Sequence, residues 1–187
     1  MTSRSFKSTS PLWVRARAWI TVSLISIVPA IAVPAFTLGL RVNLTASEPL
    51  GIWRIHPLER PSAVGDLVFV CPPQTADMAE ARGREYLRRG FCPGGYAPLI
   101  KMIVAVSGQK IEVDQMVRID GLNLPHSSPV SRDGKGRKLR AFDGGTVPAG
   151  HVFLYSSFVG SFDSRYFGPV PASGVIGLAS EVLTYAP

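Results

Sequence analysis

The chain has 187 residues, of which 46% are hydrophobic and 18% are charged, and its formal net charge is +7. This length supports about one domain of ordinary size with a hydrophobic core of its own. The basic residues gather at 82–89 and 132–140, and neither cluster belongs to a known nucleic-acid-binding motif. The absence of such a motif argues against a nucleic-acid partner, and the charge indicates a solvated surface with a bias toward the membrane surface.

A basic segment followed by a long apolar run opens the chain. Four cations precede the run, whereas the first acidic residue is Glu48. Residues 19–40 are long enough to cross a hydrocarbon core of about 30 Å, and the positive charge before them favours a cytoplasmic N-terminus. We therefore predict a cytoplasmic segment at 1–18, one transmembrane helix at 19–40 and an exported domain at 41–187.

A cleaved signal peptide is the competing interpretation of the same residues. Ala30-Ile31-Ala32 has the small-residue pattern of a cleavage site. However, the apolar run exceeds the roughly 7–15 residues of a signal-peptide core and continues through Phe36 and Leu38. An uncleaved anchor is favoured, and the sequence leaves cleavage open.

The stretch from Arg41 to Arg54, RVNLTASEPLGIWR, follows the apolar run directly. It carries two hydroxyl side chains, Thr45 and Ser47. The Pro and Gly after them predict a tight, exposed turn rather than the interior of a helix or strand. Ser47 is therefore either one solvated hydroxyl in a linker next to the membrane or a serine presented to a substrate that leaves the bilayer.

Short apolar runs separated by turn residues dominate the rest of the chain, which predicts a mainly β fold of coiled antiparallel sheets. One short helix is expected at 75–89, ended by Gly90, although Gly83 weakens it. A polar, Gly-rich excursion is expected at 125–145. The strands are expected at 66–70, 99–106, 111–113, 117–124 around an Asp-Gly turn, 152–155 and 175–182.

The two cysteines, Cys71 and Cys92, both fall in the predicted exported domain. An oxidising compartment allows a disulfide between them, which would close a loop around the charged segment and stabilise the domain by roughly 3 kcal/mol. Two thiols are too few for a metal site, so neither a metal nor a cofactor is expected.

Lys101 interrupts the most apolar predicted strand, between Ile100 and Met102. If its side chain alternates outward at a strand edge, it is an ordinary solvated cation. If it is buried, the low dielectric favours the neutral amine, which can act as a general base for a serine hydroxyl. None of the three histidines has a neighbouring carboxylate that would mark an oriented base, so no Ser-His-Asp triad is indicated.

Three segments resemble the motifs of the serine-lysine signal peptidases, family S26, and most closely those of the TraF-type conjugative-transfer peptidases. They occur in the expected order behind the predicted anchor. The segments are NLTASEPLGIW at 43–53, IKMIVAVSG at 100–108 and SFDSRYFGP at 161–169. The resemblance implies a signal-peptidase-like domain of coiled antiparallel β-sheet.

The resemblance also implies roles for individual residues. Ser47 would be the nucleophile and Lys101 the general base. The Thr45 hydroxyl would help the Ser47 backbone N–H to form the oxyanion hole, and Ser161 would orient the lysine amine.

Asp163 and Arg165 match a supporting ion pair of the family, although an ordinary surface pair in a turn fits the sequence nearly as well. Two segments depart from the pattern of general signal peptidases. Ser107-Gly108-Gln109 replaces the usual Pro-Gly-Asp, and residues 157–160 replace a Gly-Asp-Asn-Arg lead-in. Both departures point toward a specialised enzyme.

By this resemblance the chain is expected to be a single-pass serine endopeptidase of the bacterial inner membrane with a periplasmic catalytic domain. The expected substrate is a membrane-tethered propilin of a conjugative type IV secretion system. Water, or the pilin's own amino terminus, would resolve the acyl-enzyme, so the sequence leaves hydrolysis and cyclisation open. It also leaves open contacts with other conjugative-transfer proteins.

A general type I signal peptidase is the alternative within the same enzyme class. A non-catalytic, membrane-anchored β subunit of a secretion assembly is the alternative from another class. The presence of both Ser47 and Lys101 argues against that subunit, and the predicted span argues against a soluble, self-cleaving repressor with the same two residues.

Overall fold

The computed structural model describes residues 13, 17, 29–30 and 32–186, and the chain divides into two compact units at 1–40 and 41–187. In the first unit, residues 32–37 are helical, and the chain leaves the helix through Gly39, whose φ of +77° suits glycine. Within the described residues, no helix is long and apolar enough to span a membrane. Residues 19–28 and most of 1–18 lie outside the described residues, so the cytoplasmic segment and the anchor stay predictions.

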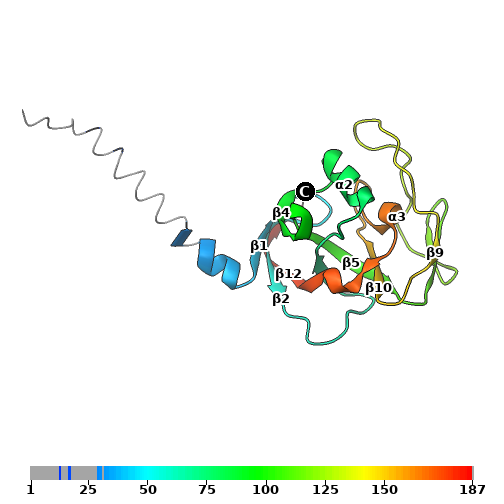
Figure 1. Cartoon of the computed structure of the whole chain (residues 1–187), viewed down its shortest axis with the longest axis horizontal. Coiled ribbons are helices and arrows are strands. Elements are labelled where there is room, and N and C mark those ends of the chain that lie inside the picture. Colours follow the sequence, from blue (N-terminus) through cyan, green and yellow to red (C-terminus); the bar gives the residue numbers. More distant parts are fainter. Residues whose placement is uncertain (1–12, 14–16, 18–28, 31, 187) are drawn as a thin grey trace, which may run out of the picture. The chain divides into compact units, whose positions relative to one another are not determined.

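The second unit consists mainly of antiparallel strands, as the sequence predicts, and all of them except β4 form two sheets (Figure 1). The larger sheet has the order β1-β2-β12-β3-β5-β10-β11, and the smaller has the order β8-β7-β6-β9. The strands are β1 Leu40–Asn43, β2 Leu50–His56, β3 Leu67–Val70, β4 Arg89–Cys92, β5 Leu99–Val106, β6 Lys110–Val113, β7 Val117–Ile119, β8 Leu122–Asn123, β9 Gly145–Thr146, β10 His151–Tyr155, β11 Val170–Pro171 and β12 Val175–Tyr185.

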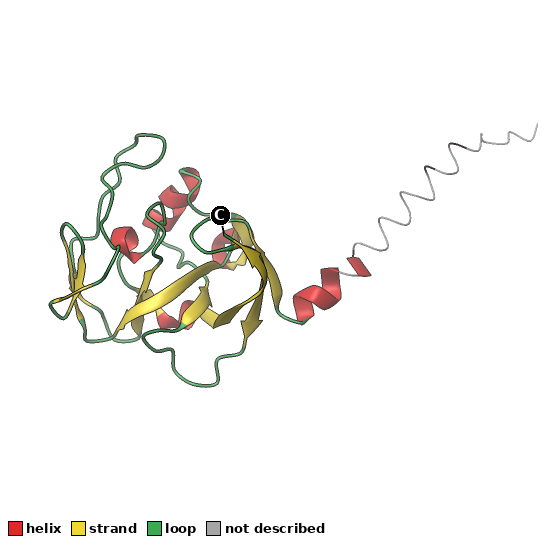
Figure 2. Cartoon of the chain, turned by 180° about the vertical axis from the view of Figure 1, so that it is seen from behind, coloured by secondary structure: helices red, strands yellow, loops and turns green. Residues whose placement is uncertain are grey.

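Short helices lie beside the strands (Figure 2). They are α2 Ala76–Gly83, α3 Ser164–Phe167 and the 3₁₀ turns η1 Pro93–Gly95 and η2 Ala172–Gly174. The Thr75 side chain caps α2 by accepting a hydrogen bond from the Met78 N–H at 3.3 Å, and the helix buries Met78 and Ala81. The caps and buried faces, rather than length, therefore hold these short helices in place.

The predicted helix at 75–89 is too long, because α2 ends at Gly83. The chain turns there through Glu85, whose φ is +68°, and this turn brings Leu87 into the core at 4% exposure. Gly90 does not end a helix but lies in β4, where an added Cβ would stand 2.4 Å from the Ala97 Cα. Glycine is required at position 90 because the backbones of residues 90 and 97 lie close together.

The predicted turn between Arg41 and Arg54 is also narrower than expected, since strands β1 and β2 flank residues 44–49. Gly51 lies inside β2 with a φ of +134°. An added Cβ would stand 2.2 Å from the Leu183 carbonyl oxygen of β12. The glycine is therefore required by strand pairing rather than by the turn.

Strand β5, which matches the predicted strand at 99–106, is interior to the larger sheet. It pairs with β3 on one side and with β10 on the other. Val68, Ile103 and Leu154 from these three strands belong to one apolar cluster with Met78 of α2. β3 pairs with residues 99–102 of β5 and β10 with residues 102–106, so Lys101 pairs with Val68 of β3 in a strand that is interior to the sheet.

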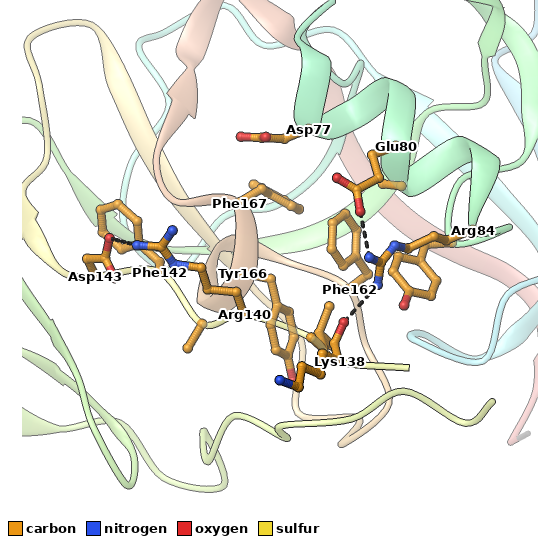
Figure 3. A pocket seen from close by; sticks show the side chains of 14 residues that line it. Asp77, Glu80, Arg84, Lys138, Arg140, Phe142, Asp143, Phe162, Tyr166 and Phe167 are labelled. Carbon is orange, nitrogen blue, oxygen red and sulfur yellow. Dashed lines mark hydrogen bonds and ion pairs between the residues drawn. The ribbon is translucent and has the colours of Figure 1, made fainter. Parts of the chain in front are cut away.

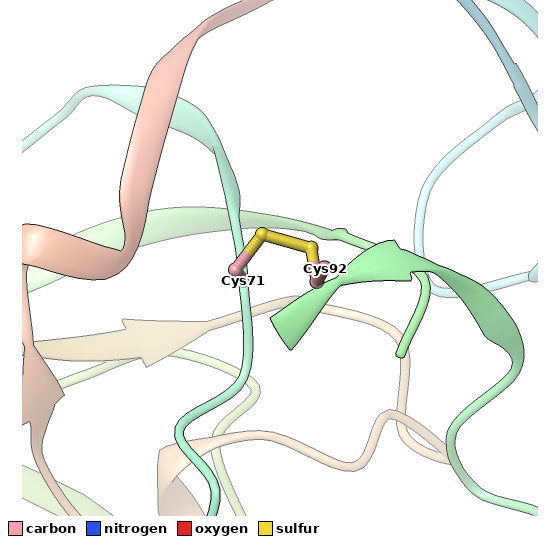
Figure 4. The surroundings of a disulfide bond; sticks show 2 residues. All are labelled: Cys71 and Cys92. Atoms are coloured by element: carbon pink, nitrogen blue, oxygen red, sulfur yellow. A yellow bond between two sulfur atoms is a disulfide. The ribbon is translucent and has the colours of Figure 1, made fainter. Parts of the chain in front are cut away.

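A disulfide joins Cys71 to Cys92 and closes the loop that contains α2 (Figure 4). The two Cα atoms are 5.5 Å apart, and the cysteines are separated by 21 positions. A loop of this length corresponds to about 3 kcal/mol of stabilisation in the chain-entropy account. The bond ties the α2 segment to the end of β3.

Candidate active site

The turn that carries Ser47 is fixed by side chains from three places. The Ser47 carbonyl accepts a hydrogen bond from the Ser156 hydroxyl, and Trp53 Nε1 donates to the Pro49 carbonyl at 2.9 Å. The Asn43 side chain lies beneath the turn and is 8% exposed. Ser47 itself is half-buried, so it belongs to a built structure rather than to a solvated linker.

Lys101 does not alternate outward. Its residue exposure is 2%, and it pairs in register with Val68 of β3, whereas the next residue, Met102, is 41% exposed. Burial lowers the pKa of Lys101 to about 8, from a usual value of 10.5, because the low dielectric disfavours the ammonium ion. The interpretation of Lys101 as a solvated cation at a strand edge is therefore wrong.

The charges around Lys101 come from both the Ser47 turn and the third motif. The carboxylates of Asp163 and Glu48 favour the ammonium and partly oppose the effect of burial, whereas Arg165 disfavours it. Glu48 directly follows Ser47, and burial raises its pKa while the nearby charge of Lys101 lowers it. The structure thus brings the first and second motifs within electrostatic range of each other.

Asp163 and Arg165 form a fully buried ion pair, with 0% side-chain exposure for each partner. Arg165 Nε donates to Asp163 Oδ1 at 2.8 Å, and Nη2 donates to Oδ2 at 2.9 Å. Asp163 also accepts from the backbone N–H groups of Ser156 and Arg165. The pair is therefore part of the interior, not an ordinary surface pair in a turn.

The rest of the Arg165 guanidinium is also enclosed. It contacts the carbonyls of Ser128, Ser156, Phe158 and Ser161 at 3.2–3.4 Å. Its Cζ lies 5.2 Å from the Tyr155 ring centroid and 5.7 Å from that of Tyr166. Because the guanidinium is fully buried, water does not screen these contacts. Its hydrogen bonds therefore hold the backbone of the third motif in place.

Ser161 is 3% exposed. Its backbone N–H and carbonyl form hydrogen bonds, whereas its hydroxyl forms none. Its N–H donates to the Phe158 carbonyl, and its own carbonyl accepts from Arg165. Within the described part of the chain, Ser161 Oγ is the one buried side-chain polar atom without a hydrogen-bond partner. A buried hydroxyl of this kind is available to a polar group that enters the site.

The histidines take no part in this site. His56 shares a hydrogen bond with the Ser180 hydroxyl, and His151 with the Ala149 carbonyl. No carboxylate pairs with a histidine in residues 32–186, and no cluster of metal-ligating side chains occurs among the described residues.

A pocket of about 650 Å³ lies between α2, α3 and residues 138–143, next to the third motif (Figure 3). Aromatic rings, including Phe162 and Tyr166, line it, and the ion pairs Glu80–Arg84 and Arg140–Asp143 stand on opposite sides of these rings. Neither Ser47 nor Lys101 lines this pocket. This pocket is thus separate from Ser47 and Lys101.

The polar excursion is held against this region. Asp133 accepts hydrogen bonds from the Tyr86 hydroxyl at 2.5 Å and from Arg137 Nε at 2.6 Å, and these bonds hold the pKa of its carboxyl well below the usual range. The Tyr86 ring in turn lies 4.9 Å from that of Phe162, between centroids. Residues 131–143 therefore contact the third motif through Tyr86.

Sequence reasoning assigned no role to Asn43, Ser156 or Glu48. Asn43 carried one usable signal, since an Asn two residues before a Thr favours a side-chain-capped turn. Ser156 carried none, because it is 109 positions from the Ser47 carbonyl that it contacts.

The family model described as signal peptidase, peptidase S26, matches residues 13–184. A conjugal transfer protein TraF of Sinorhizobium fredii is 62% identical over 149 residues, covering 80% of this chain and 79% of the relative. The TraF of Agrobacterium tumefaciens is 57% identical over 160 residues, covering 86% and 91%. A plasmid transfer protein TraF of Escherichia coli is 38% identical over 157 residues, covering 81% and 86%.

A solved structure of a signal peptidase I from Enterococcus faecalis is also similar, with 20% identity and a TM-score of 0.39. The match covers 64% of this chain and 97% of that one. The family model spans nearly the whole chain, and the relatives are matched over most of their length. The chain therefore belongs to the peptidase S26 family of signal peptidases, among its TraF-type members.

Proposed function

We propose that the chain is a membrane-anchored serine endopeptidase in which Ser47 is the nucleophile and Lys101 the general base. The observation that carries the proposal is the burial of Lys101 in an interior strand, within electrostatic range of the turn that holds Ser47. Burial without a salt bridge penalises the ammonium ion, and the neutral amine is the form that can accept the serine proton.

The pKa of about 8 suits this task. At pH 7 it leaves about one chain in ten with a neutral amine, and a base with a pKa near the working pH is the most effective. The displacement from 10.5 corresponds to about 3 kcal/mol of unfavourable burial of the charge. A scaffold protein would gain nothing from that burial, which argues against a non-catalytic subunit.

The reaction follows from these positions. Ser47 Oγ attacks the scissile carbonyl carbon while Lys101 Nζ accepts the hydroxyl proton, and the resulting oxyanion accepts a hydrogen bond from the Ser47 backbone N–H. The C–N bond then breaks, and the leaving amine takes the proton from Lys101. The product is an ester on Ser47, which a second nucleophile, deprotonated by Lys101, resolves.

The third motif supports the base. In this proposal the Ser161 hydroxyl, which has no hydrogen-bond partner in the structure, would orient the Lys101 amine, and the Asp163–Arg165 pair fixes the segment that carries Ser161. Arg165 also disfavours the ammonium form of Lys101, which keeps the amine basic but neutral.

The proposed substrate is a pilin precursor used in conjugation. The relatives named above are conjugal and plasmid transfer proteins, and the predicted anchor at 19–40 ends a few residues before Ser47. A precursor tethered in the inner membrane by its own leader would present its cleavage site at that depth, on the periplasmic side. A general signal peptidase remains the second candidate, and the departure at Ser107-Gly108-Gln109 favours the specialised one.

The intact mass of the pilin encoded beside this chain tests the proposal. Cells with the unchanged protein should contain processed pilin, and cells with Ser47→Ala should contain only precursor. Ser157→Ala, which removes an exposed hydroxyl, is the matched control and should process normally. Processed pilin with Ser47→Ala would contradict the proposal, and a product one water lighter than the linear form would identify cyclisation.

A further inference from the structure

The Asn43 side chain makes five hydrogen bonds inside the turn that carries Ser47. Its Nδ2 contacts the carbonyls of Thr45 at 2.9 Å, of Glu48 at 3.0 Å and of Pro49 at 3.0 Å, so its two hydrogens are shared among three acceptors. Its Oδ1 accepts from the Thr45 N–H at 3.1 Å and contacts the Thr45 hydroxyl at 2.7 Å. One amide therefore holds both ends of the turn.

The orientation of this amide is fixed by its neighbours. Three carbonyl oxygens surround one end of the amide, and because carbonyls only accept, that end must be the NH₂ group. The other end is then Oδ1, which also only accepts. The Thr45 hydroxyl must therefore donate its single proton to Asn43, and no hydroxyl proton is left for an oxyanion.

Unlike the Thr45 hydroxyl, the backbone N–H of Ser47 is available to bind an oxyanion. It donates to no other residue in the described part of the chain. The carbonyls of the turn are occupied, since Asn43, Trp53 and Ser156 together donate to those of Thr45, Ser47, Glu48 and Pro49. The turn thus presents a free N–H at Ser47 while its acceptors are satisfied, which is the arrangement an oxyanion hole needs.

We propose that Asn43 is the positioning residue of the Ser47 turn, and that Thr45 acts through Asn43 rather than as an oxyanion donor. This rests on the proposed function, in which Ser47 is the nucleophile. It departs from the role that the family resemblance implies for Thr45. The two roles differ in what happens when the Thr45 hydroxyl is removed.

The two accounts predict different losses for Thr45→Val. Loss of an oxyanion donor lowers the acylation rate by about 100- to 1,000-fold. Loss of one neutral hydrogen bond within the turn lowers it by less than about tenfold. Asn43→Ala, which releases the whole turn, should lower it by about 100-fold or more, because small displacements of a nucleophile have effects of that size.

The experiment is a double-mutant cycle on the full chain in membranes, with the pilin precursor in single turnover. The rate of acyl-enzyme formation reports the positioning of Ser47, and its amplitude reports the fraction of folded enzyme. Thr45→Val should lower the rate less than tenfold, Thr45→Ser should restore it, and Thr45→Val in the Asn43→Ala background should add less than a twofold loss. A 100-fold loss from Thr45→Val in either background would overturn the proposal.

If Asn43→Ala does not fold, Asn43→Asp provides the second background. It keeps the acceptor for Thr45 but replaces the NH₂ donors with an oxygen, so the rate should fall while Thr45→Val still has its small effect. Ser47→Ala separates the two proposals: acylation by that variant would refute the function itself, whereas an inactive Ser47→Ala with a 100-fold loss from Thr45→Val would refute only the role of Asn43.

Discussion

Two parts of the domain contain the same kinds of side chain in different surroundings. The buried polar cluster, defined here as Lys101, Ser161, Asp163 and Arg165, is at most 3% exposed at each residue. The rim of the aromatic pocket carries Glu80–Arg84 and Arg140–Asp143, whose side chains are 30–82% exposed. The rim pairs are close, yet water screens them, so they add little to stability.

Burial changes what these groups can do. On the rim, each cation stays charged beside its carboxylate. In the buried polar cluster, Asp163 forms its salt bridge with Arg165, and Lys101 forms no salt bridge with any described residue. The lysine is therefore the group whose charge is least supported, and its pKa falls into the range where it can act as a base.

Replacing Lys101 should give the largest contrast between the two regions. Lys101→Met should lower pilin processing by about 1,000- to 10,000-fold because the base is gone. The same change should raise the unfolding free energy at pH 7 by up to about 3 kcal/mol, because a buried charge is removed. Processing is checked by intact mass and stability by denaturant unfolding.

Lys110→Met is the control for that substitution, since the Lys110 side chain is 66% exposed. It should leave processing unchanged and alter stability by no more than about 0.5 kcal/mol. Retained processing in Lys101→Met would show that the buried lysine is not the base.

Breaking one ion pair in each region should show whether burial or short distance determines the contribution of a pair to the unfolding free energy. Asp163→Ala leaves the Arg165 guanidinium buried and unpaired, so it should lower the unfolding free energy by about 3–5 kcal/mol. Asp143→Ala leaves Arg140 in water and should lower it by less than about 1 kcal/mol. Equal losses, measured by denaturant unfolding of both variants, would contradict the comparison.

Removing the disulfide should have a slightly smaller effect. Cys71→Ser with Cys92→Ser should destabilise the domain by about 3 kcal/mol, because the loop of α2 is then free in the unfolded chain. Unfolding with and without reductant measures the difference. Peptide mapping without reductant should find the two cysteine peptides linked, and two free thiols in oxidised material would refute the bond.

The smallest expected effect is a shift in the pH dependence of the acylation rate. The rate should rise with pH through about 8, as Lys101 loses its proton. Glu48→Gln removes a negative charge that favours the ammonium form of Lys101, so the midpoint should move down by up to about one unit. Glu80→Gln on the pocket rim is the control and should leave the midpoint in place.

The lowered pKa of Lys101 also determines how the unfolding free energy changes with pH. Between about pH 8 and 10.5 the unfolded chain still binds the Lys101 proton, whereas the folded chain has lost it. The contribution of Lys101 to the unfolding free energy should therefore rise with pH across this window. A contribution that falls across the window, measured as the difference between the unchanged chain and Lys101→Met, would contradict the lowered pKa.

Contiguous patterns were the part of this protein that could be predicted from its sequence. The apolar run at 99–106 predicts β5 to the residue. The short motifs predict roles for Ser47, Lys101 and the segment of Asp163, and these roles stay predictions. Features that depend on contacts between distant residues could not be predicted. Gly51 suggested a turn because nothing in the sequence shows that the Leu183 carbonyl approaches it.

The same limit applies to the site. The sequence leaves Lys101 undecided between a solvated and a buried side chain, because alternation fits both, and only its 2% exposure in the folded domain decides it. The hydrogen bond from Ser156 to the Ser47 turn joins residues that no local pattern connects. The amide of Asn43 is local, yet its proposed role appears only when its contacts with Thr45, Glu48 and Pro49 are seen together.

The most direct measurement of the central claim is an NMR titration of Lys101 in the full chain, with ¹³Cε-labelled lysine in detergent micelles. The Lys101→Met variant assigns its signal. The account predicts a midpoint near pH 8 for this lysine, well below the value of about 10.4 for a lysine in a model peptide. A Lys101 midpoint near 10.4 would mean that the amine is charged at working pH and is not the base for Ser47.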